Sequence, residues 1–97
     1  MTIDVTDLPD QDRFEARDAD GTVLGVAAYR REPGLVVFTH TEVDPRHEGH
    51  GVGSTLVREA LAAVRAAGDR IDPQCPFVRA FVADHPEYAD LVADARR

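Results

Sequence analysis

The stretch that decides the fold runs from Thr41 to Leu61 and reads TEVDPRHEGHGVGSTLVREAL. It begins at the end of an apolar segment typical of a strand and ends inside a segment with helical periodicity. Between them lie three glycines, at positions 49, 51 and 53. Glycine permits a positive φ and leaves backbone N–H groups open to a neighbour. The stretch therefore predicts a turn from a strand into a helix, either a plain tight turn or an anion-binding loop.

The segment after the glycines has the pattern of an amphipathic helix. Apolar residues recur with helical spacing, and Arg58, Glu59 and Arg65 fall on the opposite side. Gly68 stands where a helix commonly ends. We therefore predict a helix over 52–67 whose buried face consists of residues 52, 56, 57, 60, 61, 64 and 67.

The N-terminal half reads as β-strands joined by short turns. The sequence predicts a short strand around Ile3 and Val5, and longer strands over 13–19, 23–32 and 35–43. Gly21 and the pair Pro33-Gly34 supply residues suited to tight turns. The last of these strands is apolar on both faces at its start, which indicates a central position. Short connections favour an antiparallel meander.

The C-terminal part predicts one more strand and a second helix. RIDPQC, residues 70–75, reads as a short strand in which Pro73 removes one hydrogen-bond donor. PFVRAFVADH, residues 76–85, reads as a helix that begins at Pro76 and stops before Pro86. A strand, a helix and a further strand imply a locally parallel pair. The fold class is thus α/β with a mixed sheet, in one domain over 1–97.

Composition limits the class of partner. The chain has 97 residues and a net charge of −7, and all 11 of its Lys and Arg positions are arginine. This acidic balance argues against nucleic acid or an anionic membrane as the main partner. The N-terminus lacks the features of a signal peptide, and no apolar stretch has the length of a membrane span. One cysteine, Cys75, fits a reduced, cytoplasmic setting.

The glycines match two well-known phosphate-binding patterns poorly. A Walker A loop needs a lysine that the chain lacks, and a dinucleotide fingerprint needs a glycine or alanine where Ser54 stands. Spacing alone therefore leaves a plain strand-to-helix turn and an anion site as open alternatives. If the loop binds an anion, unpaired N–H groups at the positive end of the helix dipole would hold it.

The wider stretch resembles the acetyl-CoA-binding motif of the GCN5-related N-acetyltransferase (GNAT) superfamily, Q/R-x-x-G-x-G/A. The motif falls on Glu48 to Gly53, with Glu48 in place of the usual Gln or Arg. CPFV at 75–78 and HPEY at 85–88 are similar to the small, single-domain YjdJ-like branch, and the likeness extends from Phe14 to Val92. It implies a minimal fold in which the sheet splays open between two parallel strands.

The resemblance implies that acetyl-CoA binds with its pantetheine arm in the splay and its pyrophosphate on the glycine loop. The implied cofactor-binding residues are Val43, Glu48, Gly49, His50, Gly51, Val52, Gly53, Ser54 and Thr55. The expected function is acetyl transfer to an amine, carried by a small molecule or a protein, in a monomer or homodimer. The alternatives are a CoA-binding module without turnover and a small structural protein with a glycine turn.

Cys75 is the first candidate for chemistry. It precedes Pro76 and so stands at the N-cap of the predicted second helix, where the helix dipole favours a thiolate. Such a group could accept the acetyl group or lie beside the thioester. A free cysteine is also commonly a small buried apolar residue. The sequence leaves both interpretations open.

His40, Glu42 and Tyr88 are the other catalytic candidates. On a regular strand, Val36, Phe38, His40 and Glu42 share one face, so the row would become polar as it nears the glycine loop. Histidine suits the removal of a proton from an acceptor amine. Tyr88 is the candidate proton donor to the leaving CoA thiolate, as the resemblance suggests. No Cys and His spacing typical of zinc occurs, so we predict no metal.

Overall fold

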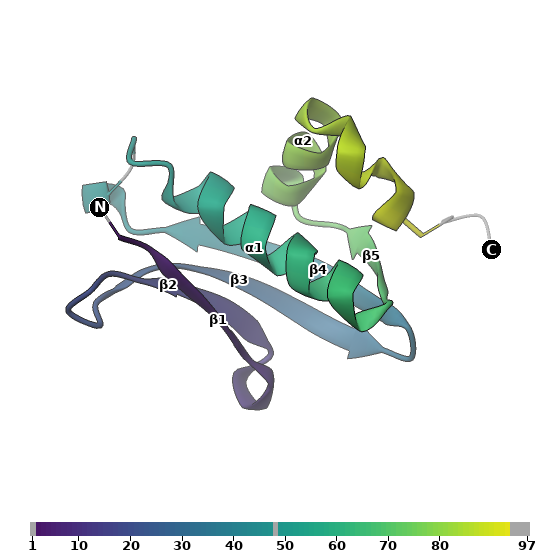
Figure 1. Ribbon diagram of the computed structural model, residues 1–97, viewed down its shortest axis with the longest axis horizontal. Coiled ribbons are helices and arrows are strands. Elements are labelled where there is room, and N and C mark those ends of the chain that lie inside the picture. Colours follow the sequence, from purple (N-terminus) through teal and green to yellow (C-terminus); the bar gives the residue numbers. More distant parts are fainter. Residues whose placement is uncertain (1, 48, 94–97) are drawn as a thin grey trace.

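The computed structural model describes residues 2–47 and 49–93. Five strands form one sheet (Figure 1): β1 Asp4–Leu8, β2 Arg13–Arg17, β3 Val23–Glu32, β4 Leu35–Val43 and β5 Arg70–Pro73. There are two α-helices, α1 Val52–Ala67 and α2 Pro76–Asp84. Short 3-10 turns occupy Pro9–Gln11, Pro45–His47 and Pro86–Leu91.

The sheet has the predicted mixed topology. Strands β1 to β4 form an antiparallel meander, and β5 pairs with β4 in parallel. Strand β2 ends at Arg17 rather than at position 19, because the Asp18 side chain accepts hydrogen bonds from the N–H groups of Asp20 and Thr22 and makes a turn. Helix α1 has the predicted bounds, and Gly68 ends it with a φ of 79°.

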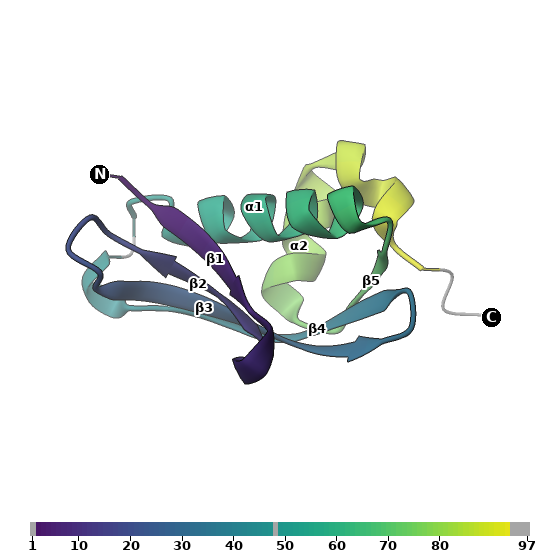
Figure 2. The same ribbon diagram turned by 60° about the horizontal axis from the view of Figure 1, so that its bottom comes forward.

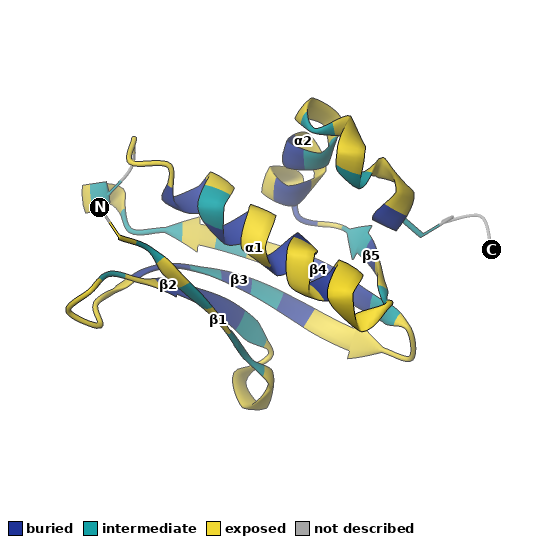
Figure 3. Cartoon of the chain, in the orientation of Figure 1, coloured by how far each residue is buried: buried dark blue, intermediate teal, exposed yellow. Residues whose placement is uncertain are grey.

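Both helices lie on one face of the sheet (Figure 2). The inward side of α1 is buried, while its outward side is exposed (Figure 3). Ala67, which the periodicity places on the inward side, is exposed at the last turn. The rings of Phe14, Tyr29 and Phe38 meet beneath the helices, with centroids 5.4 to 6.3 Å apart. No helix in the described part of the chain is long and apolar enough to cross a membrane.

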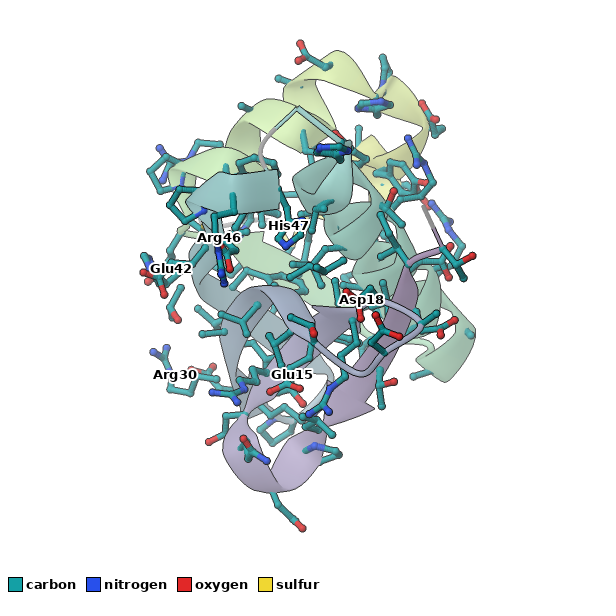
Figure 4. All side chains as sticks on the ribbon, turned by 90° about the vertical axis from the view of Figure 1, so that its left-hand side faces the viewer. Glu15, Asp18, Arg30, Glu42, Arg46 and His47 are labelled. Carbon is teal, nitrogen blue, oxygen red and sulfur yellow. The ribbon has the colours of Figure 1, made fainter. Side chains whose placement is uncertain are left out.

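The opposite face of the sheet carries a buried carboxylate. Glu15 on β2, labelled in Figure 4, is 1% exposed. Arg13 and Arg17, on the same strand, form ion pairs with its carboxylate and cover it. Arg17 Nη2 lies 2.7 Å from one carboxylate oxygen of Glu15, and Arg13 binds the other. Burial raises the pKa of the Glu15 carboxyl, but the hydrogen bonds from Arg17 and Arg13 outweigh it and hold that pKa below its usual range.

Strand β4 contains a bulge that changes which side chains face the helices. Ala28 on β3 pairs with His40, and the next residue, Tyr29, pairs with Phe38, so Thr39 is an extra residue on β4. The predicted row of Val36, Phe38, His40 and Glu42 is therefore wrong. The prediction assumes that side chains alternate regularly along the strand. The inserted residue Thr39 instead moves the side chains after it to the opposite face of the sheet.

The consequence is visible in the exposure of the side chains after the bulge. Val36 and Phe38 are buried in the core, but the side chains of His40 and Glu42 are 62% and 72% exposed. Figure 4 shows Glu42 at the outer side of the sheet, away from the helices. Thr41 instead turns toward the helix side, where it meets Cys75.

The parallel pair opens partway along β4. Its ladder joins 35–38 to 70–73, so the last pair is Phe38 with Pro73. The N–H groups of Gln74 and Cys75 then both donate to the Phe38 carbonyl, and the chain leaves the sheet to enter α2. Pro73 has no N–H to continue the ladder. The predicted splay is therefore present, and it begins immediately after Phe38.

Candidate active site

A cavity of about 400 Å³ lies where β4 has parted from β5. It extends from the second half of β4 to the first turns of the two helices. Nine residues line it: Thr41, Val43, His47, Gly49, Gly51, Val52, Gly53, Ser54 and Phe77. The cavity thus connects the open half of a strand with the glycine loop predicted to bind an anion.

The glycine loop presents the N-terminus of α1 to this cavity. Gly49 and Gly51 have φ values of 88° and 75°, which side chains rarely adopt, so both need glycine. Gly51 is the N-cap of α1, and the N–H of Thr55 makes the first bond of the helix, to the Gly51 carbonyl. The N–H groups at 52–54 precede that bond and, as in any helix, have no partner within it. They form a row of donors at the positive end of the dipole.

The predicted cofactor-binding residues divide into three groups. Six of them line the cavity: Val43, Gly49, Gly51, Val52, Gly53 and Ser54. His50 and Thr55 are not among the described residues of its lining, and the Thr55 N–H is used within α1. Glu48 lies outside the described residues. The geometry therefore supports the glycine loop as a ligand-binding site, and most of the lining residues lie in the turn that starts α1.

Gly53 differs from the other two glycines of the loop. It lies inside α1 with helical backbone, and a Cβ built on it would fall 2.5 Å from Cζ of Phe77. By contrast, a Cβ on Gly49 or Gly51 would meet nothing within 4 Å. A side chain at Gly53 would therefore force the Phe77 ring on α2 to move, whereas the helical backbone of Gly53 would accept other residues.

The segment before the loop carries a charged pair and a histidine. Arg46 Nη2 lies 2.8 Å from Oδ2 of Asp44, and this hydrogen bond lowers the pKa of the Asp44 carboxyl to about 2. Arg46 thus offsets a negative charge close to the loop. His47 lines the cavity, with its N–H bonded to the Asp44 carbonyl. The sequence places His47 in the loop, but only the structure shows that it lies on the cavity wall.

Cys75 lies immediately behind the cavity wall. It is 2% exposed and belongs to the core, and its thiol makes a hydrogen bond with Oγ1 of Thr41 at 3.2 Å. The residue occupies the predicted N-cap position of α2, but its side chain makes no capping hydrogen bond to that helix. Thr41, which is not one of the predicted site residues, therefore separates the sulfur from the cavity.

The remaining catalytic candidates lie away from the cavity. The ring of His40 is paired with Glu42 at 3.7 Å on the outer side of the sheet, and neither is part of the lining that the described residues form. Tyr88 follows α2 and packs against Phe81 and His85, with ring centroids 5.7 and 6.4 Å apart. Their catalytic roles stay predictions, and this arrangement does not favour them.

The fold and the site together define a class of protein. In it, the parallel pair of a mixed sheet opens beside a helix N-terminus that is rich in glycine. A family model described as GCN5-related N-acetyl-transferase matches residues 13–91. The chain therefore belongs to this acetyltransferase family. A comparison with curated proteins finds no match.

Solved structures show the same fold. A GCN5-like protein from Staphylococcus aureus, solved by NMR, superposes with a TM-score of 0.71 at 21% identity, covering 93% of this chain and 87% of that one. A GCN5-related N-acetyltransferase from Kribbella flavida superposes with a TM-score of 0.51 at 32% identity. That match covers 61% of this chain and only 38% of the Kribbella protein.

Proposed function

We propose that the chain is an acetyl-CoA-dependent N-acetyltransferase that acetylates an amine of a small molecule or protein. The observation that carries the proposal is the continuity of one cavity from the glycine loop to Thr41. A ligand bound there can place phosphates at one end and a thioester at the other. Membership of the acetyltransferase family supports the assignment.

The phosphate end is supported by the N-terminus of α1. A pyrophosphate is stabilised by several N–H donors and by the positive end of a helix dipole. The donors at 52–54 meet both conditions, and the positive φ of Gly49 and Gly51 bends the backbone so that no side chain stands over it. The site needs no lysine or arginine, which fits a chain with a net charge of −7.

The thioester end is supported by the open half of β4. A strand that has lost a neighbour presents backbone N–H and C=O groups along its free edge. In the proposed reaction the amine attacks the thioester carbonyl, the carbon–sulfur bond breaks, and CoA leaves as the thiol while the amine loses a proton. The Thr41 hydroxyl accepts from the Cys75 thiol and can donate its own hydrogen to the carbonyl oxygen, where negative charge develops.

Direct transfer fits the geometry better than an acetyl-cysteine intermediate. The Cys75 sulfur is buried and is hydrogen-bonded to Thr41. A covalent route would therefore require the sulfur to move past the Thr41 side chain to reach the thioester. We therefore expect no acetylated Cys75 peptide by mass spectrometry after a trapped reaction with isotopically labelled acetyl-CoA. An adduct that forms and decays at the rate of turnover would establish the covalent route instead.

One experiment separates this proposal from a CoA-binding module without turnover. The protein is incubated with acetyl-CoA and a panel of primary amines, polyamines and lysine peptides, and free thiol is measured as it appears. Amine-dependent thiol release supports the proposal. CoA binding by calorimetry without any thiol release would support the binding module, and an absence of both would favour a structural role for the glycine turn.

A further inference from the structure

Phe77 is an apolar side chain in an unusual position. Among the described residues, only Val23 and Phe77 are large apolar side chains classed as exposed, at 38% and 41%. Phe77 lies in the first turn of α2, directly after Cys75 and Pro76, and its ring lines the cavity. An exposed ring at the wall of a cavity is available to a ligand.

The ring can occupy this position because Gly53, next to it, has no side chain. The Cζ, Cε2 and Cε1 atoms of the ring lie 2.5, 3.1 and 3.3 Å from the position that a Cβ on Gly53 would occupy. The Cζ end of the ring therefore packs against the first turn of α1, and any side chain at position 53 would displace it. Gly53 leaves room for the Phe77 ring, and we call this contact the seat of Phe77. It joins the first turns of α1 and α2 beside the cavity.

The seated ring also divides two cavities. A second hollow of about 170 Å³ lies between α1 and α2. It is lined by Ser54, Phe77, Ala80, Phe81, Asp84 and His85. Ser54 and Phe77 line both hollows, so the ring of Phe77 stands between them. If the ring were removed, the larger cavity would open into the smaller one.

We propose that the Phe77 ring is the wall that holds the pantetheine arm of acetyl-CoA in the larger cavity and directs it toward Thr41. This inference rests on the proposed function. If phosphates bind at the start of α1 and the thioester at Thr41, the arm between them passes Phe77, which belongs to the same lining. The arm is uncharged and rich in methylene groups, so an apolar ring suits it.

The first test compares ligands with and without the arm. Binding of CoA, and of adenosine 3′-phosphate 5′-diphosphate, which lacks the arm, is measured by calorimetry for the wild type and for Phe77→Ala. The variant should bind CoA about tenfold more weakly, since it loses an apolar contact and its cavity opens into the smaller hollow. It should bind the nucleotide with an affinity within about twofold of that of the wild type. Val23→Ala, which removes the other exposed apolar side chain, should change neither affinity.

The outcomes separate this proposal from the proposed function. If Phe77→Ala lowers the affinity for both ligands equally, the ring only supports the helix N-terminus, and the proposal that it holds the pantetheine arm is wrong. Unchanged CoA binding would overturn it as well. If the wild type binds the nucleotide but gains nothing from the arm, the wall fails while the phosphate site stands. If it binds neither ligand, both proposals fail.

A double-mutant cycle tests the seat itself. Gly53→Ala should lower the unfolding temperature and weaken CoA binding, because its new methyl group collides with the ring. In the Gly53→Ala/Phe77→Leu protein the collision is relieved, so much of the loss of unfolding temperature should be recovered. Phe77→Leu alone keeps an apolar side chain and serves as the reference. Additive effects of the two substitutions would show that Gly53 and Phe77 act independently, and would overturn the seat.

Discussion

The two halves of strand β4 have different neighbours and different tasks. Residues 35–38 pair with β3 on one side and with β5 on the other, and Val36, Val37 and Phe38 are buried. Residues 39–43 pair with β3 alone among the described strands, and they are exposed or half-buried. The first half holds the fold together, and the second half forms a wall of the cavity.

Two local features separate the halves at almost the same point. The bulge at Thr39 reverses which side chains face the helices, and Pro73 ends the ladder with β5. A sheet that continued in register would fill this space with a paired strand. The site therefore exists because regular pairing stops after Phe38.

The largest expected effect is on the covered half. Phe38→Ala should reduce the free energy of unfolding by about 3–5 kcal/mol, because Phe38 is 1% exposed and packs with Phe14 and Tyr29. Glu42→Ala, in the open half, should change it by no more than about 0.5 kcal/mol. Urea unfolding measures both. Similar losses for the two variants would remove the distinction between the halves.

A buried charge away from the cavity should affect stability without affecting the site. The pKa of Glu15 is lower in the folded chain than its usual value of 4.5, so the charged form stabilises the fold above that pH. This contribution should disappear as the pH falls below 4.5 through the lower folded pKa. Glu15→Gln should cost about 1–2 kcal/mol at neutral pH by the loss of charged hydrogen bonds.

Urea unfolding of the wild type and Glu15→Gln from neutral pH to pH about 3 provides the measurement. The gap between the two proteins should narrow as the carboxylate becomes protonated. CoA affinity at neutral pH should be the same in both. A gap that widens on acidification would mean that burial, rather than the two arginines, controls the pKa of Glu15.

The glycine loop offers a matched pair of substitutions. Gly51 and Gly21 have φ values of 75° and 85°, and a Cβ on either would meet nothing within 4 Å. Alanine at each position should therefore destabilise the fold by a similar amount, about 1–2 kcal/mol. Only Gly51→Ala should weaken CoA binding, by about tenfold in calorimetry, since only it lies on the cavity. Equal affinities for CoA in the two variants would argue against a phosphate site on the loop.

The smallest expected effects distinguish two neighbouring residues on opposite faces of β4. Thr41→Val removes the hydroxyl that contacts the Cys75 thiol and should lower kcat/KM about tenfold, with the fold intact. His40→Ala should leave kcat/KM within about twofold, because His40 faces away from the cavity. A large loss for His40→Ala, with no loss for Thr41→Val, would restore the histidine as the catalytic base.

Much of the fold could be predicted because it follows from local patterns. The spacing of apolar residues and the position of Gly68 defined α1, and Pro76 marked the start of α2. The bulge at Thr39 has no such signal, since no glycine or proline marks it. Because the alternation was extended past Thr39, the faces of His40 and Glu42 were assigned wrongly.

The rest of the site depends on contacts between segments distant in the sequence. Thr41 meets Cys75, and Phe77 packs on Gly53, in each case across more than 20 residues. A glycine motif indicates an open backbone but not which ring will lie against it. The predicted N-cap position of Cys75 was confirmed, whereas the direction of its thiol required the structure.

The proposed function requires acetyl-CoA to lie between the open half of β4 and the start of α1. A titration of isotopically labelled protein with CoA, followed by backbone amide NMR, tests it most directly. We expect shifts for the amides of Thr41, Gly51, Gly53, Ser54 and Phe77, whereas the amides of Glu15 and Val26, whose side chains lie on the outer face of the sheet, should not shift. Shifts centred on the outer face, or no shifts at saturating CoA, would contradict it.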